Sequence, residues 1–489
     1  MKKAAKAKPS HAPTEVLHVY LDATECRKVG RLALHERQIL FEYDSAFLAS
    51  GIQLSPFYLP LQPGVIGSRG GQIGGLFGVF NDSLPDGWGR LLLDRALAKL
   101  GVNTNALSPL DRLAHVGRNG MGALTYEPDH NPTDPTIADI NLDAVARDAA
   151  KVLKGDTQSV VTELLALNNA SGGARPKVVV QASADLQRIV HWAGPLPKGY
   201  RHWIIKFPSV VDDNAIGTIE YGYALMAQAA GVEMPRTHLF TTGKSGRYFG
   251  VERFDRDRDR RIHMHSVSGL LGADIKVPTL DYNDLMKVTH RLTRNVGDLE
   301  RMFRLACFNV FAHNRDDHAK NFSFIMDATG QWALAPAYDL TFSPGPGGEQ
   351  STTVLGEGRS PGVSQLEQLA KLHGIKSATA IIDQTQAAIS KWKDFAKAAG
   401  VPKRASDDIA AVIVPATIPN VVRGKGTSPS TKKRPTNKQQ TMTAPPMTPT
   451  TTSPSTTNTP AKKRATGPKK PAAKEMPTKP TKTAAKAKR

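Results

Sequence analysis

The chain has 489 residues and a formal net charge of +20 at pH 7. A chain of this length can bury a sizeable core, and it suggests about three domain-sized units. No run approaches the ~18 consecutive apolar residues that a membrane-spanning helix needs, so the sequence excludes a membrane protein of that kind.

The positive charge lies at the two ends of the chain. Residues 421–489 contain 17 of the 64 Lys and Arg residues and one of the 44 acidic residues, and residues 1–8 contain four lysines. The remaining 43 basic and 43 acidic residues balance each other across residues 9–420. The body of the chain is therefore neutral, and its charge does not indicate a nucleic-acid-binding surface.

Cys26 and Cys307 are the two cysteines, and they are far apart in the sequence. Two such residues do not make a disulfide framework, so a reducing cytoplasm fits best. The N-terminus is basic, but no apolar segment of signal-peptide length follows it. We therefore expect a soluble cytoplasmic protein.

Residues 16–21, 29–34 and 39–43 alternate apolar and polar positions, which predicts an antiparallel β-meander. Pro85-Asp86-Gly87 then breaks the chain before a helix that ends near Gly101. That helix is expected to present one apolar face, made of Trp88, Leu91, Leu92, Ala96 and Leu100. A second short helix and a Gly-rich turn occupy 110–124, and the Pro- and Asp-rich stretch 127–139 indicates a linker.

A small-residue loop, Gly172 to Lys177, runs into the β-branched strand that begins at Val178. Such a loop lets backbone N–H groups approach phosphates closely. An ordinary hairpin turn before a strand is the alternative.

Lys206 lies in the apolar strand His202 to Pro208, where an unpaired ammonium would be costly to bury. In a kinase such a lysine contacts the α- and β-phosphates and pairs with a helix glutamate. The helix predicted over 215–230 offers Glu220 as that partner. The alternative is an edge strand whose lysine faces solvent.

Two further strands are expected at 238–242 and 248–254, and the second ends where a hinge between two lobes would contact adenine. The run from Arg253 to Arg261 alternates in sign, which predicts a solvated and self-pairing surface. Helices are expected at 284–291, 299–312, 365–373 and 380–399.

Asp316 is followed five positions later by Asn321, and a hairpin over 322–336 separates Asn321 from Asp339. A kinase-like phosphoryl-transfer site needs this arrangement, because one carboxylate orients the acceptor hydroxyl while the Asn and the second carboxylate hold Mg²⁺ against the ATP phosphates. Alternatively, His313, Asp316, Asp317 and His318 could ligate a metal directly, but their spacing matches no trusted zinc motif.

Beyond about residue 420 the composition is Lys, Thr, Pro and Ala, which cannot bury enough apolar surface to offset the ordering entropy. We expect a flexible basic tail. It either binds phosphates of DNA or RNA without specificity, in a salt-dependent way, or only solvates the chain.

Taken together, these motifs resemble the HipA-type serine/threonine kinases, the toxins of bacterial type II toxin–antitoxin pairs. The matching stretches are Gly173–Lys177, Ile205–Pro208, Val251–Arg256, Asp316–Ser323 and Tyr338-Asp339, with Phe80–Trp88 and Val116–Leu124 in the N-terminal part. An Asp-Phe-Gly motif and the full protein-kinase glycine pattern are missing.

The resemblance implies an α+β fold: a small N-terminal β-meander and helix domain, a two-lobed protein-kinase-like region with a mainly helical C-lobe, and a disordered basic tail. The expected bounds are 1–14 for a flexible N-terminus, 15–130 for the N-terminal domain, 140–260 for the N-lobe, 261–405 for the C-lobe and 420–489 for the tail.

The resemblance also implies roles for individual residues. Asp316 would be the catalytic acid, and Asn321 with Asp339 would hold Mg²⁺. The expected ATP-binding residues are Gly172, Gly173, Ala174, Arg175, Pro176, Lys177, Lys206, Glu252, Arg253, Phe254, His318, Ala319, Lys320, Asn321, Tyr338 and Asp339. Family members phosphorylate a loop serine of their own; its usual place is Ala170 here, so Ser171 is the remaining candidate.

The function expected is therefore an ATP- and Mg²⁺-dependent serine/threonine-protein kinase that acts as a toxin. It would phosphorylate a translation component such as an aminoacyl-tRNA synthetase, and a helix-turn-helix antitoxin that binds operator DNA would neutralise it. The alternatives are a nucleotide-binding partner of a DNA-bound repressor, with tail-driven nucleic-acid binding, and a small-molecule kinase.

Overall fold

The structure, a computed structural model, describes nine stretches of the chain. These are residues 13–68, 73–130, 137–155, 160–168, 172–209, 212, 215–243, 246–274 and 279–415. All of them fall within one compact unit. The expected basic tail, most of the expected flexible N-terminus, and the serine candidate at Ser171 lie outside the described residues. No helix among the described residues is long and apolar enough to cross a membrane.

The N-terminal part contains a five-stranded antiparallel sheet in the order β4-β3-β2-β1-β5. Its strands are β1 (Val16–Asp22), β2 (Cys26–His35), β3 (Gln38–Tyr43), β4 (Val65–Gly67) and β5 (Leu124–Glu127). Along β1 the side chains of Leu17, Val19 and Leu21 are buried, as the alternation of apolar residues requires. The predicted meander is confirmed.

Four helices lie in the described residues of this part of the chain. They are α1 (Ser45–Ser50), α2 (Gly78–Asn81), α3 (Gly87–Lys99) and α4 (Pro109–Val116), with the 3₁₀ turns Ile73–Gly75 and Thr104–Ala106. Helices α1, α2 and α4 pack beside this sheet, whereas α3 contributes Trp88 and Leu92 to the core of a second sheet. Ser108 and Asp111 form a capping box that starts α4. The face predicted for α3 was partly wrong: Leu100 follows the last helical residue and is 63% exposed, while Leu93 and Leu97 are buried.

A second antiparallel sheet has six strands in the order β10-β11-β9-β7-β8-β6. Its strands are β6 (Ala138–Asp139), β7 (Lys177–Ser183), β8 (Ile189–His191), β9 (Tyr200–Lys206), β10 (Thr237–Thr242) and β11 (Gly246–Glu252). One face packs on α5 (Leu142–Leu153) and α6 (Val161–Asn168), through residues such as Val178, Val180 and Ile205. Side chains alternate along a strand, so Lys177 and Lys206 occupy the other face. They are also cross-strand partners.

Helix α7 (Ile216–Ala229) packs against the β10–β11 hairpin. Gly217 allows this contact, because a Cβ there would lie 2.6 Å from the carbonyl oxygen of Arg247. The close packing fixes the helix relative to the sheet, and it therefore fixes Glu220 opposite β9.

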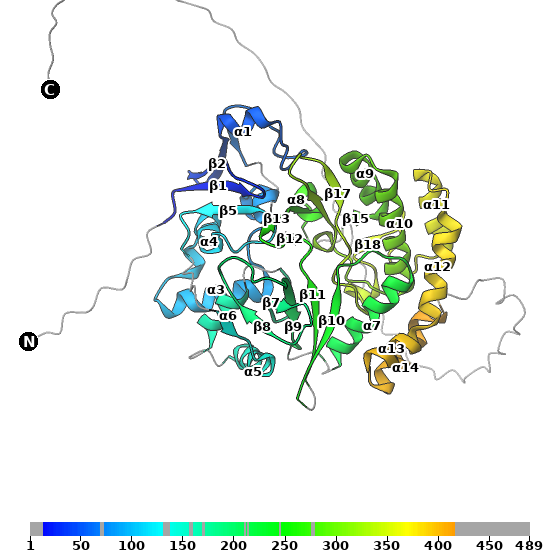
Figure 1. Cartoon of the computed structure of the whole chain (residues 1–489). Helices are drawn as coiled ribbons and strands as arrows, with labels where there is room; N and C mark the ends of the chain where they lie inside the picture. The colour runs from blue at the N-terminus through cyan, green and yellow to red at the C-terminus, as the bar shows by residue number, and fades with distance from the viewer. Residues whose placement is uncertain are drawn as a thin grey trace, which may run out of the picture. The chain divides into compact units, whose positions relative to one another are not determined.

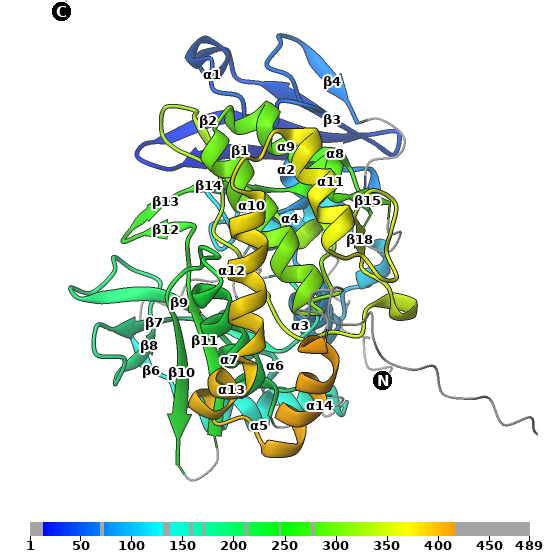
Figure 2. The ribbon, with the colours of Figure 1, turned by 90° about the vertical axis from the view of Figure 1, so that its right-hand side faces the viewer.

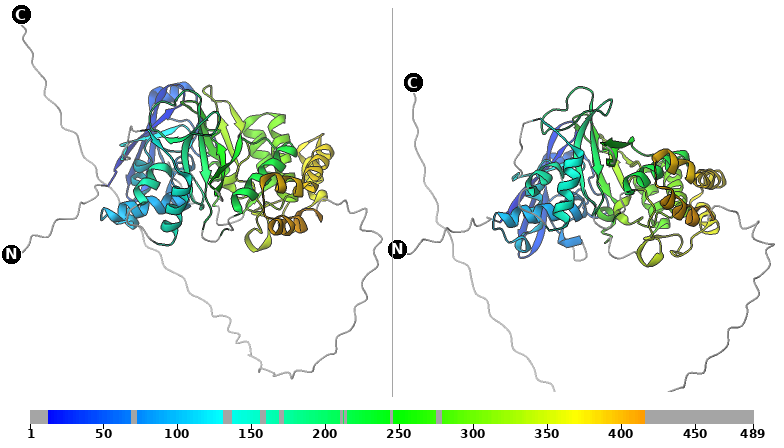
Figure 3. Two further views of the ribbon diagram at one scale, coloured as in Figure 1. Left: turned by 60° about the horizontal axis from the view of Figure 1, so that its bottom comes forward. Right: turned by 90° about the horizontal axis from the view of Figure 1, so that it is seen from below.

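The C-terminal part is mainly helical. It contains α8 (Val267–Leu271), α9 (Tyr282–Thr293), α10 (Val296–Phe311), α11 (Val363–His373), α12 (Ala378–Ser390), α13 (Trp392–Ala399) and α14 (Lys403–Ile413). Figure 2 shows α10 and α12 side by side. Figure 3 shows the yellow and orange helices, α11 to α14, on the side away from the blue strands. The single helix predicted over 380–399 was wrong, since it breaks at Lys391 into α12 and α13.

A three-stranded sheet, β14-β16-β17, packs against α9 and α10, and Figure 1 shows β17 beside these helices. Its strands are β14 (His263–Ser266), β16 (Ser323–Met326) and β17 (Trp332–Leu334), and the short pairs are β12 (Arg256–Asp257) with β13 (Arg260–Arg261) and β15 (Leu280–Asp281) with β18 (Thr352–Thr353). The 3₁₀ turns Ala319–Asn321 and Pro346–Gly348 complete the elements. The predicted α+β architecture of the described residues is confirmed.

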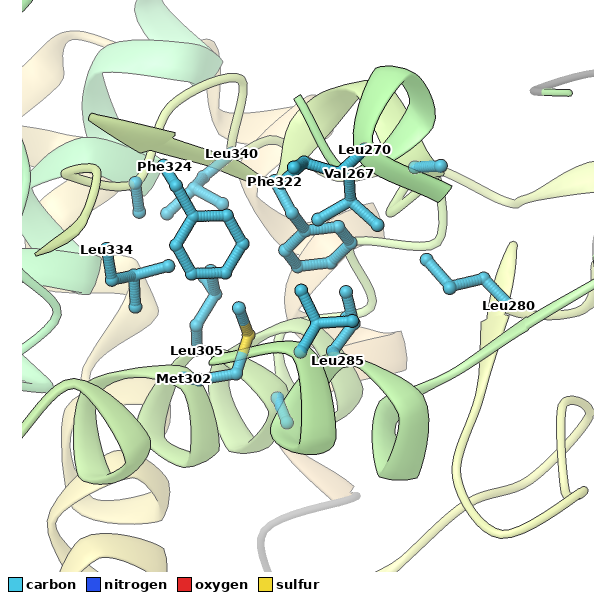
Figure 4. Close-up of a cluster of buried hydrophobic side chains, with 14 of the residues drawn as sticks. Val267, Leu270, Leu280, Leu285, Met302, Leu305, Phe322, Phe324, Leu334 and Leu340 are labelled. Atoms are coloured by element: carbon cyan, nitrogen blue, oxygen red, sulfur yellow. The ribbon is translucent and has the colours of Figure 1, made fainter. Parts of the chain in front are cut away.

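The core beneath this small sheet holds the ends of the loop on which the site depends. Figure 4 shows Phe322 and Phe324 pointing toward Leu285, Met302 and Leu305, and Phe322 and Leu340 are 2% and 4% exposed. Phe322 directly follows Asn321, and Leu340 directly follows Asp339. Burial of the two apolar neighbours therefore fixes the backbone from which both polar side chains project.

Candidate active site

Four charged side chains from different elements meet between the six-stranded sheet and the helical part, in a region that we call the cleft. They are Lys177 of β7, Lys206 of β9, Glu220 of α7 and Asp339, which follows β17. We call these four residues the cleft cluster. The ammonium of Lys206 donates hydrogen bonds to the carboxylates of both Glu220 and Asp339. Lys206 is 9% exposed, so the alternative of a solvent-facing lysine on an edge strand is wrong.

The charges of the cluster stabilise one another. Burial would lower the pKa of Lys206, but Asp339 and Glu220 outweigh burial and hold that pKa above its usual value. Burial would likewise raise the pKa of Asp339, but Lys206, Lys177 and Arg175 outweigh it and hold that pKa well below its usual value. Both groups are therefore charged at neutral pH.

Lys177 is the less well paired cation of the cluster. Its ammonium donates to the carbonyl oxygen of Gly172, and it forms no ion pair within the described residues. Burial and the neighbouring Lys206 lower its pKa, although Asp339 and Asp86 act in the opposite direction. An anion in the cleft would stabilise this ammonium.

Arg175 projects from the same small-residue loop. Its guanidinium pairs with Asp212, with Nε 3.2 Å from Oδ2, and Asp212 also accepts a hydrogen bond of 2.9 Å from the N–H of Ser209. The loop enters the sheet at Pro176, whose carbonyl oxygen accepts from the N–H of Phe207 at 2.8 Å. Gly172 and Ala174 are exposed in this loop.

Asp316 and Asp317 are adjacent in sequence but differ in environment. The side chain of Asp316 is 61% exposed, and burial of its remainder together with Asp339 raises its pKa. Asp317 is fully buried, and it accepts hydrogen bonds from the hydroxyl of Tyr282 at 2.8 Å and the N–H of Thr352 at 3.1 Å. Asp316 can therefore reach a molecule in the cleft, while Asp317 fastens the loop to its neighbours.

A 3₁₀ turn over Ala319–Asn321 determines the backbone conformation of the remaining loop residues. The side-chain amide of Asn321 donates to the carbonyl oxygen of Asp316 at 2.7 Å, which directs its own oxygen elsewhere. Nε2 of His318 lies 3.9 Å from Oδ1 of Asp316. Ala319 is buried, and the ammonium of Lys320 reaches Asp86 at 2.7 Å.

Tyr338 contacts both Phe254, at the predicted hinge, and Lys320, in the loop that carries Asp316 and Asn321. Its ring stacks on Phe254 with centroids 5.6 Å apart and planes inclined by 29°. Its hydroxyl donates to the carbonyl oxygen of Lys320 at 2.6 Å and lies 2.6 Å from Oγ of Ser323. The residue after it, Asp339, has a φ of +57°, a left-handed conformation that is uncommon for a residue with a side chain. The hydroxyl contacts of Tyr338 and the buried Leu340 hold this turn.

The run of alternating charges beside the hinge is not a solvated surface throughout, and this prediction was partly wrong. Arg253 and Asp255 are 5% and 0% exposed, and the guanidinium of Arg253 makes two hydrogen bonds of 2.8 and 2.7 Å to Asp255. Asp255 also accepts from Arg256 at 2.9 Å and from the N–H of Gly122 at 2.7 Å. We call Arg253, Asp255 and Arg256 the hinge cluster.

The hinge cluster bears on the predicted adenine contacts. The side chain of Arg253 is used in an ion pair with Asp255, which also accepts a hydrogen bond from Gly122 of the N-terminal part, so only the backbone of Arg253 could face a nucleotide. Glu252 ends β11, and its N–H donates to the carbonyl oxygen of Arg236 at 2.8 Å. Phe254 is half-buried and offers an aromatic face.

Direct ligation of a metal by the His and Asp residues of the loop is not supported. Within the described stretches, no group of three or more His, Cys, Asp or Glu side chains could hold a metal ion. A divalent cation here would instead need oxygen atoms from a ligand beside those of Asn321 and Asp339, as Mg²⁺ usually does.

A Ser–His–Asp arrangement lies elsewhere, but its environment does not suit catalysis. Nε2 of His265 is 3.0 Å from Oγ of Ser55, and Nδ1 of His265 is 2.6 Å from Oδ2 of Asp82. Ser55 is 2% exposed and His265 is fully buried. A substrate carbonyl could not reach the hydroxyl, so the three residues connect the N-terminal part to β14.

Asp86 also lies at the site, although the sequence analysis did not predict it there. One carboxylate oxygen accepts a hydrogen bond from the N–H of Gly173, and the other accepts from Lys320 at 2.7 Å. Asp86 lies in the Pro-Asp-Gly break before α3, and the local pattern indicated only a turn. Asp212, the ion-pair partner of Arg175, was also not predicted.

The chain matches two protein-family models. The model described as the HipA N-terminal domain matches residues 17–127, and the model described as the HipA-like C-terminal domain matches residues 169–393. Together they cover nearly all of the N-terminal sheet, the six-stranded sheet except β6, and most of the helical part.

Similarity to individual proteins extends over much of the chain. A protein of Sinorhizobium fredii named "Putative kinase Y4mE" is 28% identical over 349 residues, which is 66% of this chain and 72% of that protein. A chain in the structure of the Shewanella oneidensis MR-1 toxin–antitoxin complex of HipA, HipB and operator DNA matches with a TM-score of 0.59 and 17% identity. This match covers 83% of the present chain and 97% of the other, and at this identity it concerns the fold alone.

Proposed function

The chain belongs to the HipA family, and from this premise we propose that it is an ATP- and Mg²⁺-dependent serine/threonine-protein kinase. The observation that carries the proposal is the cleft cluster, in which Lys177 and Lys206 present two nearly buried ammonium groups beside the accessible carboxylate of Asp339. Such a site has cations for phosphate oxygens and a carboxylate for a divalent ion. When bound, MgATP would supply the phosphoryl group to be transferred.

The residues of the loop support a division of tasks. Asp316 is the exposed carboxylate, and it would accept the proton of the acceptor hydroxyl as the oxygen of that hydroxyl bonds to phosphorus. Asn321 and Asp339 would hold Mg²⁺ through their side-chain oxygens. Lys206 and Lys177 would stabilise the negative charge on the phosphates, and ADP would leave as the bond between the β- and γ-phosphates breaks.

The remaining residues would bind and orient. Phe254 and Tyr338 offer aromatic faces for adenine, and the backbone of Glu252 and Arg253 lies at the hinge. Catalysis of this kind relies on positioning and charge stabilisation, with no covalent intermediate on the protein.

The experiment is phosphorylation of a cell lysate with labelled ATP and Mg²⁺ or Mn²⁺. We expect labelled seryl or threonyl protein with the wild type and none with Asp316→Asn, because the proton acceptor is lost. Asp317→Asn should retain activity while it is folded. Full activity of Asp316→Asn would contradict the assignment, and no labelled protein with either metal would contradict the kinase.

We further propose a helix-turn-helix antitoxin partner, through which the chain would associate with operator DNA and by which a toxic activity on a translation component would be neutralised. The fold shared with HipA, whose structure was determined with HipB and operator DNA, supports this proposal. Co-purification with the product of an adjacent short reading frame tests it. A gel shift that needs residues 421–489 but no partner would instead favour tail-driven DNA binding.

A further inference from the structure

The turn Asp86-Gly87-Trp88 of the N-terminal part is bonded to the small-residue loop of the cleft through both polar backbone groups of Gly173. The N–H of Gly173 donates to Oδ1 of Asp86, and its carbonyl oxygen accepts from the N–H of Trp88 at 3.0 Å. Trp88 is 1% exposed, within the core that also contains Val178 and Ile205. The turn is therefore fixed to the same sheet that carries the loop, as Figure 1 lets the reader follow at α3 and β7.

The two segments leave no space for larger residues where they meet. A Cβ at Gly87, whose φ is +40°, would lie 2.5 Å from the carbonyl oxygen of Gly173 and 2.7 Å from the Cα of Ala174. A Cβ at Gly173, whose φ is +94°, would lie 2.6 Å from the ammonium of Lys177. At Gly87 the obstacle is backbone, which cannot yield as a flexible side chain can, and at Gly173 the positive φ itself favours glycine.

The second carboxylate oxygen of Asp86 extends the contact across the cleft. Oδ2 accepts a hydrogen bond of 2.7 Å from the ammonium of Lys320, in the loop that carries Asp316 and Asn321. The backbone of Lys320 is itself held by the hydroxyl of Tyr338 at 2.6 Å. Asp86 occupies the N-cap position of α3, yet its side chain makes no capping bond there. Both of its oxygens are used outside the helix.

We propose that Asp86 is a positioning residue that holds the phosphate-binding loop and the catalytic loop at a fixed separation, so that the N-terminal part completes the nucleotide site. The inference rests on the proposed kinase function. It also makes Gly173 an anchor instead of a phosphate ligand, because its N–H is already bonded to Asp86. Ionised hydrogen bonds of this kind are stronger than neutral ones, which suits a contact between two loops.

The test compares Asp86→Ala, Asp86→Asn and Asp86→Glu with Asp94→Ala as the matched control. Asp94 lies on the same helix and pairs with Arg112 at 2.6 Å, away from the loops. Binding of ATP with Mg²⁺ is measured by calorimetry. We expect Asp86→Ala to weaken binding about tenfold, and Asp86→Asn to weaken it less, because an amide oxygen still accepts one bond. Asp86→Glu should recover part of the loss, and Asp94→Ala should bind as the wild type does.

A second measurement needs no nucleotide. Hydrogen exchange of the backbone amide of Gly173 should become at least about tenfold faster in Asp86→Ala, while the amides of β7 keep their protection. Thermal unfolding of each variant identifies a general loss of stability, which would accelerate exchange throughout the sheet.

The outcomes separate the inference from the kinase proposal. Unchanged ATP affinity with unchanged exchange at Gly173 would overturn the role of Asp86. Tighter binding in Asp86→Ala would also overturn it, because the carboxylate would then compete with phosphate for the loop. A wild type that binds no nucleotide would contradict the proposed function alone, and faster exchange at Gly173 would still support Asp86 as the residue that holds the loop.

Discussion

The cleft cluster and the hinge cluster both bury charges, but they do so in different ways. In the hinge cluster, Asp255 is fully buried and accepts hydrogen bonds from two guanidinium groups and from the N–H of Gly122. In the cleft cluster the side chain of Asp339 is 37% exposed, and Lys177 donates to a carbonyl oxygen without an ion pair among the described residues. A buried charge therefore does not by itself indicate a functional site. A charged side chain that is incompletely paired and accessible from the cleft does indicate one.

The two clusters differ in what the loss of a carboxylate would affect. Removing a carboxylate from a fully satisfied buried group leaves cations without compensation, which is costly for stability. Removing one from a group that is open to ligand mainly removes a contact that forms during the reaction. The hinge cluster should therefore respond in stability, and the cleft cluster in activity.

The largest effect is expected for Asp255→Asn. Loss of the carboxylate leaves Arg253 and Arg256 buried without their anion, and it should lower the free energy of unfolding by roughly 3–5 kcal/mol. Urea denaturation measures the change. The matched control is Arg260→Ala, which breaks an exposed pair with Asp257 and should change stability by less than about 0.5 kcal/mol. Equal losses in the two variants would remove the distinction between buried and exposed pairs here.

Asp339→Asn should act in the opposite way. Because Lys206 keeps Glu220 as a partner, we expect a modest change in unfolding free energy but a fall in phosphorylation rate of about 10²–10³-fold. The measurement is initial rate against Mg²⁺ concentration. Asp327→Asn, in the turn of the same hairpin, serves as the control and should keep its activity. A rate for Asp339→Asn within a few-fold of wild type, with the same Mg²⁺ dependence, would refute the metal-binding role.

A smaller effect is expected from the pH dependence of stability. Burial raises the pKa of Asp317 to about 7, above its value in the unfolded chain, so the folded state binds the extra proton. Stability from this group is present at low pH and is lost as the pH rises toward 7, by roughly 2 kcal/mol between pH 5 and 7. Thermal unfolding from pH 5 to 7 should show a shallower decline in Asp317→Asn. An identical slope in both proteins would contradict this.

Much of the architecture could be predicted from local pattern. The alternation in β1 to β3, the helix α10 and the hairpin between Asn321 and Asp339 all follow from periodicity and turn residues over a few positions. Where the local pattern predicted an element wrongly, tertiary packing determined the structure instead. The helix expected over 380–399 breaks at Lys391, and this lets Trp392, which is fully buried, pack against Gly222 of α7.

The sequence by itself determined which residue types stand in kinase order, from Lys177 through Lys206 and Asp316 to Asp339, and their roles stay predictions. Only the tertiary structure decided that Asp317 is buried while Asp316 is open, and that Arg253 is committed to Asp255. It also brought Asp86 to Gly173, 87 positions away. Local propensity acts over a few residues, whereas a contact at such a separation depends on how the N-terminal part packs against the sheet, which no short pattern encodes.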